Sequence, residues 1–267
     1  MAMPWRLHPS VLAIEVINAA VGAFSKAFSP AGPILEIGSY YQSGYARWCD
    51  RRPLFPDLKY VGCDIRPGPG VDRIKDAEDL TFSDCSFGTV IMLETLEHLP
   101  RPERAIVEAR RVLRDDGLLL LSMPFNYRLH GFPSDYWRFT PSGFYQMLDE
   151  FQWKSVFSAG PGLKPATVFA IASKEPSRAL AVAQQKFQAE LQSQTKPLYR
   201  RLFWCALHDR GRDLLGLLVG RAAISVTFFD PVQPDAYQLA PQGKPEPPCS
   251  LMGHDHEMSS CKPKISC

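Results

Sequence analysis

The chain has 267 residues, of which 45% are hydrophobic and 22% are charged, and its formal net charge is +2 at pH 7. This length allows one well-buried domain with an appendage, or two small domains. The composition is ordinary for a globular protein, and the small net charge excludes the strongly basic footprint of a chain that binds nucleic acid along its whole length. Nucleic acid is therefore not expected as a partner.

The seven cysteines are scattered without the spacing of a disulfide framework. Free thiols are typical of a reducing compartment, so a cytoplasmic protein is expected. Apolar residues at 3/4 spacing over 11–28 predict an amphipathic helix that packs on the domain, with a cleaved signal peptide as the alternative. Charged and polar residues interrupt that stretch, and no segment of the sequence offers the roughly 20 uninterrupted apolar residues of a membrane span.

Short apolar runs alternate with helical patterns over about the first 175 residues. Apolar runs of this kind that end in small or acidic residues are typical of buried parallel strands. The sequence predicts helices over 45–51, 102–113 and 140–151 and strands over 34–37, 58–64, 71–74, 90–93, 118–122, 153–158 and 166–173. The expected fold is therefore α/β, with a doubly wound, seven-stranded, mostly parallel sheet within residues 1–175.

The alternation ends at Pro176, after which residues 176–235 are predicted to form a helical appendage and residues 236–267 a disordered tail. The apolar run 214–219 follows several arginines. It predicts a helix that packs on the domain or on a second subunit, or one that lies on a membrane surface. The tail holds Cys and His residues, but their spacing matches no compact zinc pattern, so no metal site is predicted.

Two strand ends predict a nucleoside-binding site. The first, 34–37, runs into Gly38 and Ser39, where a glycine lets the backbone approach a ligand closely. The second ends at Asp64, whose ionised carboxylate can accept hydrogen bonds from both hydroxyls of a ribose.

Four blocks in this order resemble the class I S-adenosylmethionine-dependent methyltransferases, particularly the methyltransferase domain 11 group. They are residues 34–44, 60–64, 76–80 and 90–99, followed by Arg-Val-Leu-Arg-Asp-Asp-Gly at 111–117. The first block departs from the family pattern E-x-G-x-G-x-G, because Tyr40 and Gln42 stand at the second and third glycine positions. The segment Gly-Pro-Gly-Val-Asp at 68–72 is similar to that of a subgroup with this variant first motif.

The resemblance implies S-adenosylmethionine as the cofactor and assigns its site. Asp64 would hold the ribose, Gly38 and Ser39 would admit the methionyl part, and Glu36 would support that end. Asp76 and Ala77 would flank the adenine, although Asp76 could instead be a loop cap and Glu36 a strand-end charge. The full set of predicted cofactor-binding residues is Glu36, Gly38, Ser39, Gly44, Asp64, Ile65, Asp76, Ala77 and Glu94.

The segment 124–140 follows the fifth strand and concentrates histidine, aspartate, arginine and aromatic residues. Ligands of open parallel sheets bind beyond the carboxyl ends of the strands, so this segment is expected to cover the acceptor pocket. His130 is the candidate general base, with Asp135 to orient it or act instead. The predicted catalytic residues are His130, Asp135 and Tyr136, and the predicted substrate-binding residues are His98, Trp137 and Arg138. Packing and ion pairing are the structural alternatives.

The sequence thus predicts an enzyme that transfers a methyl group from S-adenosylmethionine to a small-molecule, sugar-containing or lipid-linked acceptor. One alternative is a nicotinamide-dependent oxidoreductase, which is disfavoured because the glycines do not form G-x-G-x-x-G. The other is a degenerate methyltransferase that acts as a non-enzymatic interaction protein through its C-terminal helices.

Overall fold

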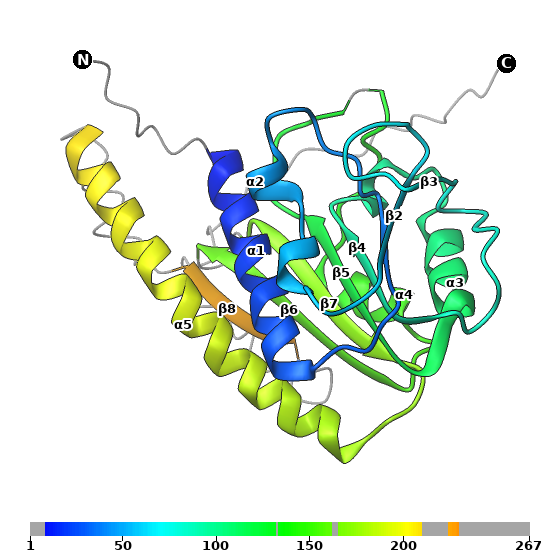
Figure 1. The fold of residues 1–267 in the computed structure, drawn as a ribbon. Coiled ribbons are helices and arrows are strands. Elements are labelled where there is room, and N and C mark those ends of the chain that lie inside the picture. The colour runs from blue at the N-terminus through cyan, green and yellow to red at the C-terminus, as the bar shows by residue number, and fades with distance from the viewer. Residues whose placement is uncertain (1–8, 132, 162–164, 210–223, 230–267) are drawn as a thin grey trace, which may run out of the picture. The chain divides into compact units, whose positions relative to one another are not determined.

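The computed structural model describes residues 9–131, 133–161, 165–209 and 224–229, and it confirms the α/β fold (Figure 1). The elements in chain order are α1 (Pro9–Phe28), β1 (Ile34–Ile37), α2 (Ala46–Cys49), η1 (Arg52–Leu54), β2 (Tyr60–Asp64), β3 (Arg73–Ile74), β4 (Phe87–Leu93), η2 (Leu96–His98), α3 (Pro102–Val112), β5 (Leu113–Pro124), α4 (Pro141–Met147), β6 (Trp153–Pro161), β7 (Thr167–Ser173), α5 (Arg178–Asp209) and β8 (Ile224–Phe229).

The strands form one sheet in the order β3-β2-β1-β4-β5-β7-β6-β8. Pairing is parallel from β3 to β5, and antiparallel between β5 and β7, β7 and β6, and β6 and β8. The strand order reverses at β1, which lies between β2 and β4. A crevice outside the carboxyl ends of the strands at such a switch point is the usual ligand site of an open α/β sheet.

Helices cover both faces of the sheet (Figure 1). On one face α3 and α4 pack in a core with Val90 and Met92, and on the other α1 and α5 pack in a second core with Ile91 and Leu93. Successive residues of β4 therefore point to opposite faces, as the twofold period of a strand requires, and both faces are apolar because both are covered.

Two helix starts follow the predicted local chemistry. Pro102 and Pro141 each lie in the first turn of their helix, where the missing N–H would have no partner in any case. Thr140 caps α4, since its Oγ1 accepts a hydrogen bond from the N–H of Gly143 at 3.1 Å. The loop that precedes α4 is thereby fixed at its far end.

The prediction was wrong for part of the C-terminal region. Residues 224–229 form a strand, β8, where the sequence was interpreted as helical, and α5 runs unbroken from Arg178 to Asp209 in place of two helices. Ile-Ser-Val-Thr-Phe-Phe alternates apolar and polar residues and suits a strand, and the edge of β6 provides its pairing partner. A smaller difference is that β5 begins at Leu113, five residues before the predicted start.

The described residues all belong to one compact unit. Within it, α5 packs against α1, with Phe187 and Leu191 fully buried. The apolar run 214–219 and the tail 236–267 lie outside the described residues. The predicted boundary between the appendage and the tail, after residue 235, lies outside them as well. Among the described helices, none combines the length and apolar character needed to cross a membrane.

Candidate active site

The parallel strands bring the first predicted residues to one edge of the sheet. Ile37 at the end of β1 pairs with Cys63 on β2 and with Met92 on β4. Because these three strands run in the same direction, the residues that follow them emerge side by side. Gly38, Asp64 and Glu94 therefore lie at neighbouring strand ends, as the sequence predicted.

The turn after β1 is tightly fixed. The N–H groups of Gly38 and Ser39 both donate to the carbonyl of Cys63, at 2.8 and 3.0 Å. Gly38 has φ +78°, and a Cβ added there would lie 2.1 Å from Oγ1 of Thr95. Only glycine fits both the backbone conformation and the space. The Ser39 hydroxyl is buried and has no hydrogen-bond partner among the described residues, so it could accept or donate one to a ligand.

Asp64 is 7% exposed at the tip of β2. Its Oδ1 accepts from the backbone N–H and from Nε of Arg66, at 2.9 and 3.2 Å, and its Oδ2 lies 3.4 Å from the Tyr40 nitrogen. The Arg66 side chain is 63% exposed, so it can move away from the carboxylate at little cost. Ile65 is 67% exposed and turns away from the core.

The unusual side chains of the first motif are accommodated by glycines in the loop after β2. A Cβ on Gly68 would lie 2.5 Å from the Tyr40 ring, and one on Gly70 would lie 2.2 Å from the Ser39 carbonyl and 2.8 Å from the Tyr41 ring. The Arg66 guanidinium lies 4.3 Å from the centre of the Tyr40 ring. The Tyr40 ring therefore packs against the loop after β2. A side chain at Gly68 would clash with this ring, so the glycine in that loop makes room for Tyr40.

Glu36 lies beneath this turn rather than at its surface. Its Oε2 accepts from the Tyr60 hydroxyl at 2.9 Å, and its Oε1 lies 3.4 Å from Nη1 of Arg51. Burial raises the pKa of Glu36, while Arg51 and the Tyr60 hydrogen bond oppose that rise. Its observed contacts tie β1 to β2 and to the segment before η1.

The predicted adenine-flanking residues have mixed placements. Asp76 is exposed, and its Oδ1 accepts from the N–H of Glu78 at 2.9 Å, which is the loop-cap geometry that was its structural alternative. Ala77 is 8% exposed and packs in the core. Gly44 has φ +91° and would meet no atom within 4 Å of an added Cβ, so it lies in open space. The cofactor contacts of all three stay predictions.

Glu94 follows β4 with φ +48°, a backbone conformation that a non-glycine residue rarely adopts. Its Oε1 accepts from the Ser122 hydroxyl at 2.7 Å, and its N–H donates to the Ser122 carbonyl at 3.1 Å. Burial, and then the nearby carboxylate of Glu97, raise the pKa of Glu94. The strained backbone holds a polar group toward the strand ends.

The segment after β5 is organised by an ion pair. Arg138 binds both carboxylate oxygens of Asp135, with Nη1 to Oδ1 at 2.6 Å and Nη2 to Oδ2 at 2.9 Å. This guanidinium holds the pKa of Asp135 well below its usual range. Asp135 Oδ2 also accepts from the N–H of His130 at 2.9 Å and lies 3.2 Å from its Nδ1. Asp135 therefore contacts both the backbone and the ring of His130, and the orienting role stays a prediction.

Tyr136 and Trp137 attach this segment to η2. The Tyr136 N–H donates to the Glu97 carbonyl at 2.7 Å, and Nε1 of Trp137 donates to the Leu99 carbonyl at 2.9 Å. The Trp137 ring stacks on Phe139 with centroids 6.0 Å apart. These contacts favour the packing alternative for Trp137, whereas the Tyr136 side chain is half exposed and free of the core.

The rings of His98 and His130 lie next to each other, and both approach the carboxylate of Glu97. Their ring centroids are 4.8 Å apart, and the Nε2 atoms of His130 and His98 lie 3.6 and 3.7 Å from Oε1 of Glu97. Nδ1 of His98 is hydrogen-bonded to the Ser134 carbonyl. The carboxylate of Glu97 raises the pKa of His130 against the opposing effect of burial, with a further contribution from Asp135.

Sequence reasoning missed Glu97 as a site residue. It is fully buried, and neither of its carboxylate oxygens has a hydrogen-bond partner. The signal was present in the run Glu-Thr-Leu-Glu-His-Leu at 94–99, but no periodicity shows that Glu97 points inward from a short 3₁₀ turn. Arg51 and Ser122 were missed for the same reason, because only the fold brings them to Glu36 and Glu94.

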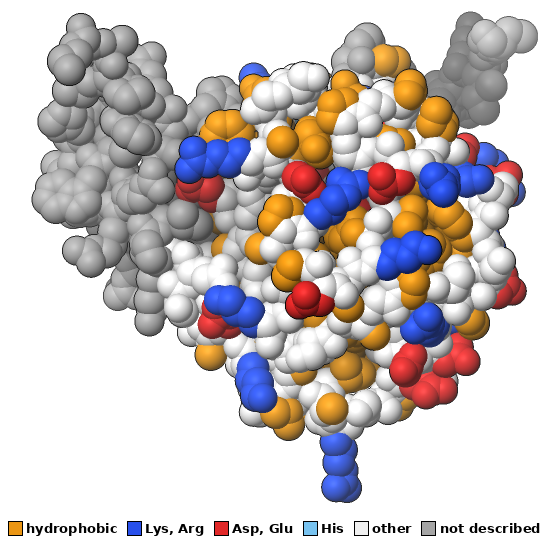
Figure 2. All heavy atoms as spheres, in the orientation of Figure 1, with side chains coloured by type: hydrophobic (Ala, Val, Ile, Leu, Met, Phe, Trp, Pro, Cys, Tyr) orange, Lys and Arg blue, Asp and Glu red, His pale blue; other side chains and the backbone are white. Residues whose placement is uncertain are grey.

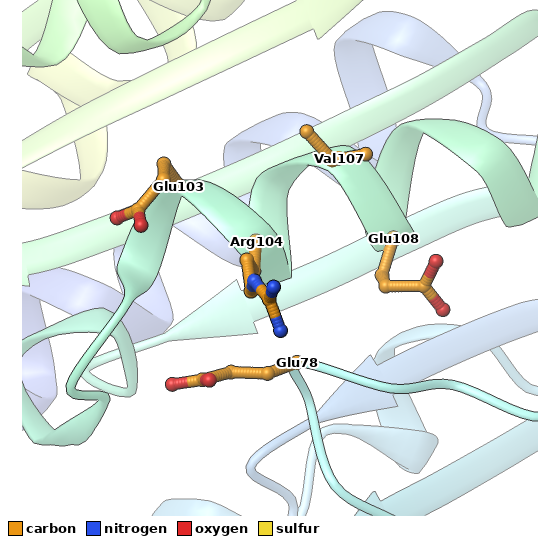
Figure 3. A pocket seen from close by; sticks show the side chains of 5 residues that line it. All are labelled: Glu78, Glu103, Arg104, Val107 and Glu108. Carbon is orange, nitrogen blue, oxygen red and sulfur yellow. The ribbon is translucent and has the colours of Figure 1, made fainter.

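A separate hollow of about 250 Å³ lies beside α3 (Figure 3). Glu78 faces Arg104 across it, and the other lining residues, all on α3, are Glu103, Val107 and Glu108. None of the predicted site residues lines it. On the face drawn in Figure 2, basic and acidic side chains are interspersed over the described residues. That distribution agrees with the absence of a basic footprint in the sequence.

Comparison with known proteins finds a similarity to methyltransferases over part of the chain. Residues 42–121 match the family model of a methyltransferase domain. A protein named as a methyltransferase in Encephalitozoon cuniculi is 42% identical over 62 residues, which are 22% of this chain and 30% of that protein. The chain therefore spans about 30% of the length of this curated relative.

Solved structures of methyltransferases are also similar. One, from Thermotoga maritima, is S-adenosylmethionine-dependent and 20% identical, with 61% of this chain and 92% of that chain covered at a TM-score of 0.46. Another, a Burkholderia thailandensis 1,6-didemethyltoxoflavin N1-methyltransferase with bound S-adenosylhomocysteine, is 14% identical over 60% of this chain and 79% of that chain, also at 0.46. Neither bears on the acceptor of this chain. The segment 42–121 is thus similar to methyltransferase domains.

Proposed function

We propose that this chain transfers a methyl group from S-adenosylmethionine to a small-molecule, sugar-containing or lipid-linked acceptor. The observation that carries the proposal is that the Gly38–Ser39 turn and Asp64 lie next to each other, at the ends of the adjacent strands β1 and β2. The bound cofactor supplies an activated sulfonium methyl group. The protein therefore has to bind the donor and hold the acceptor in line with that group.

The residues present fit the cofactor. The Gly38 position admits no side chain, and the buried Ser39 hydroxyl has no partner among the described residues. Asp64 offers two carboxylate oxygens beneath a mobile, exposed arginine side chain, and ionised carboxylates suit a ribose diol. In this proposal Gly38, Ser39 and Asp64 bind the donor, and Glu36 supports the turn from below.

The acceptor would bind between η2 and the segment that follows β5. Asp135 and Arg138 hold His130 in place there, and the half-exposed Tyr136 lies in the same segment. Arg138 uses two of its donors on Asp135, so its role is to position that carboxylate rather than to bind an acidic acceptor. A cytoplasmic location, and contact with a membrane or a second subunit through residues 200–229, remain parts of the proposal.

Calorimetry on the full chain tests the proposal. S-adenosylhomocysteine and S-adenosylmethionine should bind at one site per chain, and NAD should not. Binding of NAD alone would favour the oxidoreductase, and binding of none of the three would favour a non-enzymatic interaction protein. A screen with a methyl-labelled donor, against free sugars, sugar-containing small molecules and lipid-linked sugars, would then identify the acceptor. Label found only in acceptors of other classes would contradict the proposed acceptor.

A further inference from the structure

The buried carboxylate of Glu97 faces two histidine rings but accepts no hydrogen bond from them. It is 0% exposed, and neither oxygen accepts a hydrogen bond within the described residues. An ionised carboxylate buried without a partner is costly, and proteins normally pair it or use it to bind a metal. The groups nearest to its Oε1 are Nε2 of His130 and Nε2 of His98, at 3.6 and 3.7 Å. These separations are too long for hydrogen bonds.

The hydrogen bond of the His98 ring turns a lone pair toward Glu97, and the His130 ring lies beside an acceptor on its other side. Nδ1 of His98 is hydrogen-bonded to the Ser134 carbonyl, which can only accept, so Nδ1 carries the proton and Nε2 does not. Nδ1 of His130 lies 3.2 Å from Oδ2 of Asp135, a second acceptor. In neutral imidazoles, two ring nitrogens and one carboxylate oxygen therefore converge without a hydrogen atom between them.

We propose that Glu97, His98 and His130 bind a divalent transition-metal ion. One ligand atom from each lies within 4.8 Å of the others. Around an ion with bonds of about 2.0–2.2 Å, ligand atoms lie roughly 3–4 Å apart, so a small inward movement would complete the site. Two imidazoles and one carboxylate suit Zn²⁺, Fe²⁺ or Co²⁺ better than Ca²⁺ or Mg²⁺, which prefer oxygen ligands.

The surroundings of the two histidines match those of metal ligands. Ligating histidines usually donate their second ring N–H to a carbonyl or a carboxylate, which fixes the tautomer and the ring orientation. His98 has such a bond to the Ser134 carbonyl. Nδ1 of His130 lies 3.2 Å from Oδ2 of Asp135 without hydrogen-bond geometry, so a small rotation of the ring would complete the bond. Three protein ligands would leave a four-coordinate ion one position for water or another ligand.

This inference changes the role of His130 and replaces the prediction that the chain has no metal site. With Nε2 bound to the ion, His130 would not serve as a general base. The competing interpretation is a protonated His130 that forms an ion pair with Glu97, which would need no metal. The two interpretations differ in whether the protein binds a metal ion at these residues, so direct binding decides between them.

The experiment is a Co²⁺ titration of the full chain after chelation, followed by calorimetry and by visible absorption. Because His254 and His256 in the tail could also bind the ion, all proteins carry His254→Ala and His256→Ala. Glu97→Gln keeps the shape of the side chain and removes its charge. Glu103→Gln, at an exposed site on α3, is the matched control. Circular dichroism melting reports whether each variant is folded.

The background protein and the Glu103→Gln control should bind one Co²⁺ more tightly than the Glu97→Gln protein, by at least about 10–100-fold. Co²⁺ should also raise the melting temperature of the first two and not of the third. Equal affinities in all three, or no binding by the background protein, would overturn the proposal. If Glu97→Gln does not fold, His130→Gln decides in the same way, since its side chain is partly exposed.

Discussion

Replacing Gly38 with alanine should destabilise the protein through two separable effects. Alanine at φ +78° occupies the left-handed region, which costs about 1–2 kcal/mol. The new Cβ would lie 2.1 Å from Oγ1 and 2.8 Å from Cγ2 of Thr95, and overpacking of this kind costs about 1–3 kcal/mol. The free energy of unfolding should therefore fall by about 2–5 kcal/mol.

Gly44→Ala is the matched control. Gly44 has φ +91°, but no atom lies within 4 Å of an added Cβ. Its replacement should cost only the backbone part, about 1–2 kcal/mol. Urea unfolding followed by far-UV circular dichroism measures both variants, and the dependence on urea concentration should stay unchanged.

A double-mutant cycle isolates the contact with Thr95. Thr95→Ala removes Oγ1 and Cγ2, although it also removes the hydrogen bond from Oγ1 to the Leu93 carbonyl at 3.0 Å. Gly38→Ala should cost less in the Thr95→Ala background, with a coupling energy of about 1–2 kcal/mol. Strictly additive free energies, or equal losses for Gly38→Ala and Gly44→Ala, would refute the close approach of Gly38 to Thr95.

Two further predictions concern parts of the domain outside the candidate site. Burial raises the pKa of the Cys63 thiol to about 12, whereas Cys85 is exposed. Iodoacetamide at pH 8 should therefore label Cys85 in the native protein and spare Cys63. Equal labelling of the two in a peptide map would contradict the burial of Cys63. Glu108→Gln should lower the free energy of unfolding by about 1.5–3 kcal/mol, because Oε2 of Glu108 accepts from the Leu80 N–H at 2.7 Å and from Arg111 at 2.8 Å. Arg111 lowers the pKa of Glu108 below 4.5 in the folded protein. The difference in the free energy of unfolding between wild type and Glu108→Gln should therefore be complete above pH 4.5 and shrink as the pH falls through the folded-state pKa. A difference that does not depend on pH would refute this role of the Glu108 carboxylate.

Most of the sheet, and the strand ends at Gly38 and Asp64, could be predicted because local patterns specify them. Apolar runs marked the strands, and a glycine or an aspartate at the end of a run marked where the chain leaves the sheet. The exception was β8, where an apolar segment after a long helix was interpreted as more helix. Short apolar runs do not distinguish strand from helix, and the free edge of β6 decides the outcome.

The chemistry of the candidate site depended on contacts that no local pattern shows. Glu97 and His130 are 33 positions apart in the chain, and only the return of the segment after β5 across η2 brings them together. The tolerance of Tyr40 in a glycine position was equally hidden, because the compensating Gly68 lies on another loop. The Trp137 ring donates to the Leu99 carbonyl, as its packing alternative would require, and its predicted contact with a substrate stays a prediction.

The most direct test of the central claim is the affinity of S-adenosylhomocysteine for Asp64→Asn, measured by calorimetry beside the wild type. Asn replaces the charged acceptor with a neutral amide, and hydrogen bonds to charged groups contribute about 1.5–3 kcal/mol, so the dissociation constant should rise by about 10–150-fold. Asp57→Asn, at an exposed aspartate before β2, should leave it unchanged. An unaltered dissociation constant in the folded Asp64→Asn protein would contradict the placement of the ribose at this strand end.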